Sequence, residues 1–110
     1  MTDKIVVLNT CATEDEAERL ARLLIDQRLA ACVSIVPRVR SFYRWKGAVE
    51  RSDECLLVIK SSRALFENLR AAVEKAHSYE VPEVLALPVL AGSAPYLEWL
   101  AANLGEGSAE

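Results

Sequence analysis

The residues of this chain with the most potential for chemistry gather in one short stretch, KAHSYEVPE, residues 75–83. It holds the only histidine of the sequence, His77, beside Tyr79, two glutamates and a proline. Imidazole and carboxylate groups bind copper and zinc, and both also act as acids and bases in catalysis. The stretch is therefore a candidate for a metal site, a catalytic site, or a turn between a helix and a strand.

One histidine alone does not make a strong metal site. Copper and zinc sites usually bring together three or four nitrogen, sulfur or carboxylate donors. A positive charge such as His77 is also favourable near the C-terminal end of a helix, and Tyr79, Val81 and Pro82 are typical of a packed turn. We favour the structural interpretation of KAHSYEVPE and keep the ion site as the alternative.

Composition and charge exclude several classes of protein. The formal net charge is -3 and the pI about 5.2, so the chain has no overall attraction to nucleic acid. No window has the length of a membrane span, and the first residues lack the features of a secretory signal. The three cysteines are widely spaced, which predicts reduced thiols, with Cys32 and Cys55 as small core residues. We expect a cytoplasmic protein with no membrane and no nucleic-acid partner.

The elements that must position KAHSYEVPE begin with a strand and a helix. Residues 5–8 are a continuous apolar run rich in β-branched residues, which predicts a buried strand. Thr13 stands three residues before Glu16 in a capping box, and apolar residues follow at helical spacing. The first helix is expected over residues 14–29.

A long hairpin follows. From residue 32 to residue 46 apolar and basic side chains alternate, which predicts a long strand. Lys46 and Gly47 supply a turn, and residues 49–60 form the returning strand.

The second half of the chain repeats the order of helix and strand. Ser61 or Ser62 is expected to cap a second helix that ends near His77. Residues 84–90 read as a buried strand, in which Pro88 indicates a sheet edge or a bulge.

A short helix, capped by Ser93 with Pro95 in its first turn, closes the chain. The resulting order, β-α-β-β-α-β with a C-terminal helix, predicts an α+β ferredoxin-like sandwich with a long central hairpin. At 110 residues the chain suits one domain, residues 1–104, and the polar tail 105–110 is expected to be disordered.

The hairpin is too long for the helices that must cover it. Some fifteen strand residues span roughly 50 Å, whereas the first helix covers only about 24 Å. The overhanging half carries Phe42, Tyr43 and Trp45, whose aromatic surface needs shelter from water. We expect these residues to form a subunit interface between identical chains, and the alternative is an arm that lies on its own sheet.

Several blocks resemble the CutA family, the divalent-cation tolerance proteins. They are RLAACVSIVPRVRSFYRWKGAVE, ECLLVIKSS, HSYEVPEVLALPV and YLEWL, in the order and spacing of the family. The resemblance implies a cytoplasmic homotrimer with an architecture similar to that of the PII signalling proteins. It also implies a link to tolerance of copper and other divalent cations, so the cofactor expected is copper or another divalent cation.

The resemblance implies a copper site built from a thiol at the end of the first strand and two adjacent histidines at the end of the second helix. Here these positions hold Asn9, Ala76 and His77, so only His77 matches. Cys11 lies two residues beyond Asn9 and is a candidate replacement for the sulfur donor. Glu83 matches a carboxylate common at this place in the family. The candidate metal ligands are therefore His77, Glu83 and Cys11.

Two other classes of protein, acylphosphatase-type enzymes and RNA-recognition domains, share this order of elements. An acylphosphatase-type enzyme shares the element order, but no glycine-rich loop that could bind an anion follows the first strand. The sequence also offers no identified nucleophile that His77 could activate. We therefore expect no enzymatic activity. An RNA-recognition domain would carry aromatic residues on its first and third strands, where residues 5–8 and 55–59 have none.

The remaining alternative is a trimeric PII-like sensor or scaffold that binds a small anionic ligand in clefts between subunits. Arg38, Arg40 and Lys60 are the basic residues that would line such a cleft. Cross-strand pairing with the acidic residues across the hairpin is the competing explanation for such cations; these residues are Glu50, Asp53 and Glu54.

Overall fold

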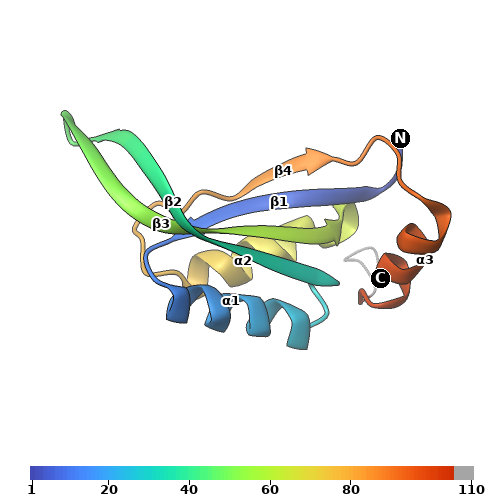
Figure 1. The fold of residues 1–110 in the computed structure, drawn as a ribbon. Helices are drawn as coiled ribbons and strands as arrows, with labels where there is room; N and C mark the ends of the chain where they lie inside the picture. Colours follow the sequence, from blue (N-terminus) through green and yellow to red (C-terminus); the bar gives the residue numbers. More distant parts are fainter. Residues whose placement is uncertain (106–110) are drawn as a thin grey trace.

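The computed structural model describes residues 1–105 of the chain. In this part the elements are β1 (Lys4–Cys11), α1 (Glu14–Asp26), β2 (Cys32–Trp45), β3 (Ala48–Ser62), α2 (Phe66–Ala76), β4 (Leu85–Pro88) and α3 (Ala94–Ala102), with a 3-10 turn at Arg63–Leu65. The strands form one antiparallel sheet in the order β2-β3-β1-β4, and α1 and α2 cover the same face of it (Figure 1). The predicted α+β ferredoxin-like arrangement is confirmed.

The core lies between the sheet and these two helices. Along β1, alternate side chains are buried, because residues of a strand point to opposite faces and only one face is covered by α1 and α2. The large buried residues come from β1, α1, β3 and α2: Ile5, Val7, Leu20, Leu24, Leu57, Ile59, Leu69 and Val73. Burying each large side chain stabilises the fold by about 1.5–3 kcal/mol. This pattern fixes the register of β1 against β3.

The β2–β3 hairpin extends beyond the helices, as predicted. Its turn at Lys46 and Gly47 has positive φ angles of 50° and 85°, the combination that matches the twist of a two-residue hairpin. Figure 1 shows the tip of the hairpin projecting past the ends of α1 and α2. Phe42, Tyr43 and Trp45 are 65%, 44% and 42% exposed. The hairpin does not fold back onto its own sheet.

Two features of the sheet differ from the predictions. A bulge interrupts β2 between Val36 and Val39, where Pro37 has no amide hydrogen to donate and Arg38 has a φ of 62°. The strand predicted over residues 84–90 is shorter, Leu85–Pro88, and its residues are exposed rather than buried. The predicted burial was wrong because β4 is an edge strand that neither α1 nor α2 covers, whereas the sheet edge indicated by Pro88 is confirmed.

The helix ends follow the predictions in part. The Thr13 hydroxyl accepts the Glu16 amide at 3.1 Å, which confirms the first cap. The helix that it begins ends at Asp26, three residues before the predicted end.

The predicted serine caps of the other two helices are absent from the described chain. Ser62 precedes the 3-10 turn without a side-chain cap, Ser61 donates to the Leu29 carbonyl at 2.7 Å, and Ser93 also makes no side-chain cap. At the C-terminal end, the Gly105 amide donates to the Arg28 carbonyl, and the rest of the predicted disordered tail, residues 106–110, lies outside the described residues.

Candidate functional site

The His77 side chain is fully buried at the end of α2, and both of its ring nitrogens are engaged. Nε2 lies 2.9 Å from the Thr10 carbonyl oxygen, and Nδ1 accepts the Tyr79 amide at 3.0 Å. Since an amide can only donate, Nδ1 carries no hydrogen and Nε2–H donates to Thr10. The neutral imidazole therefore joins the end of β1 to the turn after α2. The expected helix-ending turn is present, whereas a neutral ring does not make the expected charge interaction with the end of the helix.

Glu16 holds the same turn from α1. Its carboxylate is 4% exposed and accepts both the amide and the hydroxyl of Ser78, each at 2.8 Å. Burial alone would raise the pKa of Glu16, but the two hydrogen bonds from Ser78 outweigh it, so the pKa of the carboxyl is lowered. Glu16 is thus a buried anion that fixes the start of the loop.

Tyr79 links the loop to the hairpin. Its hydroxyl donates to Glu54 of β3 at 2.5 Å, and Glu54 is only 7% exposed. Burial and the Glu54 carboxylate raise the pKa of Tyr79 well above its ordinary value, so the phenol stays protonated and remains a donor. The ring of Tyr79 also packs against His77, with 4.8 Å between the ring centroids.

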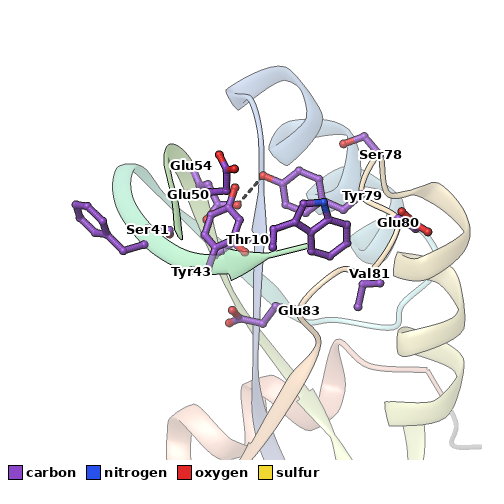
Figure 2. A pocket seen from close by; sticks show the side chains of 12 residues that line it. Thr10, Ser41, Tyr43, Glu50, Glu54, Ser78, Tyr79, Glu80, Val81 and Glu83 are labelled. Atoms are coloured by element: carbon purple, nitrogen blue, oxygen red, sulfur yellow. Dashed lines mark hydrogen bonds between the residues drawn. The ribbon is translucent and has the colours of Figure 1, made fainter. Parts of the chain in front are cut away.

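A hollow of about 830 Å³ opens where this loop meets the base of the hairpin. Figure 2 shows Tyr43 and Glu54 of the hairpin on one side and Tyr79, Glu80 and Val81 of the loop on the other. Its lining residues come from β1, the hairpin and the loop: Thr10, Ser41, Phe42, Tyr43, Trp45, Glu50, Glu54, Ser78, Tyr79, Glu80, Val81 and Glu83. We call this hollow the hairpin pocket.

The charge of the hairpin pocket is negative. Glu50, Glu54, Glu80 and Glu83 line it, and no lysine or arginine stands among the described residues of the lining. Four carboxylates near aromatic rings favour a cation over an anion. The hairpin residues predicted to form a subunit interface, Phe42, Tyr43 and Trp45, all border this pocket.

The three candidate metal ligands are placed differently from one another. Glu83 lines the hairpin pocket, and His77 is buried outside that lining with both nitrogens engaged. Cys11 is buried, with its thiol donating to the Thr13 carbonyl at 3.5 Å. Burial, with help from Glu16, raises the pKa of Cys11 to about 11, so the thiol is protonated at neutral pH. Within residues 1–105, no group of three or more His, Cys, Asp and Glu side chains is placed to hold a metal ion. The donors of one chain therefore do not fit a closed copper site.

Asn9, at the position where the resemblance implies a thiol, has a structural contact instead. Its side chain is fully buried, and its Nδ2 donates to the Glu83 carbonyl at 2.8 Å. Its Oδ1 has no hydrogen-bond partner in the described part of the chain. Asn9 thereby holds the far end of the loop against β1.

Sequence reasoning identified the loop but missed the residues that position it. Glu16 was assigned only to the capping box, and Glu50 and Glu54 only to cross-strand pairs. A buried partner for Ser78 or Tyr79 leaves no mark in local spacing, because the contacts join residues 62 and 25 positions apart. The available signal was the presence of two glutamates on each segment, Glu50 and Glu54 on the hairpin and Glu80 and Glu83 in the loop.

Comparisons with known proteins agree with this architecture. The family model described as CutA1 divalent ion tolerance protein matches residues 5–103. The divalent-cation tolerance protein CutA of Thermus thermophilus is 45% identical over 100 residues, which cover 91% of this chain and 97% of that protein. Protein CutA of Homo sapiens is 45% identical over 83% of this chain, which spans about half (51%) of the human protein.

A solved structure gives the same result. The crystal structure of CutA1 from Oryza sativa has a TM-score of 0.92 and 43% identity, with 94% of this chain and 95% of that chain covered. Both the sequence blocks and the fold are therefore shared along nearly the whole chain. The chain belongs to the family of CutA1 divalent ion tolerance proteins.

Proposed function

We propose that this chain acts in the response to divalent cations, copper among them, as a non-enzymatic homotrimer of the cytoplasm. Membership of the CutA1 family supports the link to divalent cations, since the relative from Thermus thermophilus is named for tolerance of them. In residues 1–105, no helix has the length and apolar character needed to cross a bilayer.

The observation that carries the proposal is the lining of the hairpin pocket. Its four glutamates create a negative potential that concentrates cations, whereas a small anion would be repelled. The alternative sensor of anionic ligands needs basic residues at its cleft. Arg38, Arg40 and Lys60 are not part of the lining of this pocket.

Cation binding in this proposal depends on the assembled trimer. One chain offers the pocket carboxylates but no closed set of ligands among the described residues. The aromatic residues that border the pocket are also those proposed to contact a neighbouring chain, so the pocket would lie at a subunit boundary. Carboxylate oxygens suit hard or borderline divalent ions that keep part of their water shell.

The proposal of a non-enzymatic role rests on His77. Its two nitrogens are engaged by backbone groups, which leaves neither free to act as a base toward a substrate.

Isothermal titration with Cu²⁺, Zn²⁺ and Mn²⁺, with the thiols kept reduced, tests the proposal. We expect Glu83→Gln to weaken binding severalfold, because it removes a pocket carboxylate and keeps the shape of the side chain. Glu98→Gln, on the exposed surface of α3, is the matched control and should leave binding unchanged. If the wild type and Glu83→Gln gave equal binding isotherms, the hairpin pocket would be excluded as the cation-binding site. A melting temperature raised by inorganic phosphate but by none of the three metals would favour the anionic alternative.

A further inference from the structure

Two of the three cysteines face each other across neighbouring strands. In the register of β1 against β3, Cys11 stands directly opposite Cys55. Both belong to the face of the sheet that the helices cover, and they are 0% and 4% exposed. Directly opposed residues in an antiparallel pair have Cα atoms about 4.5 or 5.5 Å apart. This separation lies within the span of about 4.4–6.8 Å that a disulfide accepts.

The pair also occupies the place in the ladder where strands open most readily. Cys11 is the last residue of β1, and Cys11–Cys55 is the terminal pair of the β1–β3 register. The ends of strands open locally at a lower free energy than their centres. Cys55 lies inside β3, so a small oxidant would reach these buried thiols through local opening of the end of β1.

The surroundings of the pair favour a neutral product over a bound metal. Glu16 and Glu54 act on Cys11, and Glu14 acts on Cys55, so the local field is negative. A soft metal held by two thiolates would place further negative charge beside these carboxylates. A disulfide carries no charge.

We propose that Cys11 and Cys55 form an intrachain disulfide when the protein meets hydrogen peroxide. When the end of β1 opens, one thiol loses its proton to solvent, and the thiolate attacks the peroxide O–O bond to give a sulfenic acid. The released hydroxide takes up a proton and leaves as one water. The second sulfur attacks the sulfenic sulfur, forms the S–S bond and releases a second water. The two thiol protons leave in the two waters, so two thiols and one peroxide give one disulfide and two waters.

The bond would lie next in the chain to two residues that line the hairpin pocket, Thr10 and Glu54. Cys11 follows Thr10, whose carbonyl oxygen lies 2.9 Å from His77 Nε2. Cys55 follows Glu54, which accepts the Tyr79 hydroxyl. Oxidation thus ties together the two strands that hold the start of the loop. This inference does not depend on cation binding.

Mass spectrometry of the full chain, without reduction, tests the inference. The Cys32→Ser variant leaves only the proposed pair and is treated with hydrogen peroxide at several protein concentrations. We expect loss of two hydrogens per chain and a linked pair of tryptic peptides, residues 5–19 and 52–60. The rate should not depend on protein concentration, and dithiothreitol should reverse the change. The melting temperature should rise on oxidation because the bond restricts the unfolded chain.

The wild type and two single variants serve as controls. Cys11→Ser and Cys55→Ser should each lose the linked peptides and the rise in melting temperature, while the wild type should link the same two peptides as Cys32→Ser. Because the wild type is itself informative, a variant that fails to fold does not remove the test. Linkage through Cys32, linkage between chains, or thiols that stay free after peroxide treatment would overturn the inference.

Discussion

His77, the residue with the most chemical promise in the sequence, is used to hold the backbone in place. The ring joins the Thr10 carbonyl and the Tyr79 amide, two backbone groups that belong to segments far apart in the chain. Burying either group without a partner would cost about 1–3 kcal/mol. Satisfying both with one side chain explains why an otherwise reactive residue is fully buried beside a pocket that is itself open.

Glu16 predicts a specific dependence of stability on pH. Its pKa is lower in the folded protein than the unfolded value of 4.5, so the folded state binds fewer protons there. The stabilisation is present above about pH 4.5 and is lost as the pH falls through the lowered folded pKa. We expect Glu16→Gln to lose about 1–3 kcal/mol at pH 7 and to show a flatter decline in acid. Denaturant unfolding from pH 3 to 7 measures this.

The control for Glu16 is Glu18→Gln, at an exposed position on the same helix. Its stability should follow the wild-type curve across the whole range. If the free energy of unfolding of Glu16→Gln and of the wild type fell equally with decreasing pH, Glu16 would not contribute to the pH dependence of stability.

Tyr79→Phe tests the link between the loop and the hairpin. The variant keeps the ring beside His77 but leaves the buried Glu54 carboxylate without its donor. A hydrogen bond to a charged group contributes about 1.5–3 kcal/mol, and we expect a loss of that order in the free energy of unfolding. Tyr43→Phe removes an exposed hydroxyl contact to Ser52 and should cost about 0.5 kcal/mol or less. Equal losses in the two variants would contradict the special role of Glu54.

The elements were predictable wherever local chemistry determines them. Alternation predicted the long hairpin, and Lys46-Gly47 predicted its turn. Thr13 predicted the start of α1, although the Glu16 carboxylate of the expected capping box binds Ser78. Ser62 and Ser93 stand at N-cap positions, of the 3-10 turn and of α3, but neither makes the predicted side-chain bond. Ser61 donates instead to the Leu29 carbonyl, a distant partner that local spacing does not reveal. Within the candidate site, the loop was predicted, whereas the Glu16–Ser78 and Glu54–Tyr79 contacts required the folded arrangement of three separate elements.

The bulge in β2 predicts an unusual response to glycine. Arg38 has a φ of 62°, a region that costs a residue with a Cβ about 1–2 kcal/mol. Glycine has no such cost, although it adds entropy to the unfolded chain. We expect Arg38→Gly to stabilise the protein by about 0.5 kcal/mol in thermal unfolding. Arg40→Gly, two residues on in the regular part of the strand, should destabilise it by about 1 kcal/mol. If both variants lost the same stability, backbone strain at Arg38 would be excluded.

At the scale of the whole molecule, the sheet leaves much apolar surface uncovered. The chain measures 44 × 25 × 23 Å, and its long axis reflects a hairpin that extends beyond the helices (Figure 1). On the edge strand β4, Leu85 and Leu87 are 57% and 49% exposed, in addition to the aromatic residues of the hairpin. Exposed apolar patches on a small protein mark interfaces. Both regions support the proposed homotrimer, since one chain of this size cannot cover them.

Sedimentation equilibrium at micromolar concentration tests the assembly. We expect a mass of three times the 12.1 kDa of one chain. The double variant Tyr43→Ser/Trp45→Ser should shift the equilibrium toward monomer, because it removes apolar surface worth about 25 cal/mol per Å² that pairing would bury.

The matched control for the assembly is Tyr96→Ser/Trp99→Ser, which removes a stacked and similarly exposed aromatic pair from α3. Because this pair lies outside the hairpin, the control should keep the trimer mass. If both double variants kept that mass, the hairpin aromatics would not be the contacts that hold the chains together. If the wild-type chain sedimented as a monomer, the proposed trimer would be ruled out, together with the proposal that cations bind at a subunit boundary. The Cys11–Cys55 inference would stand, since both residues belong to the core of one chain.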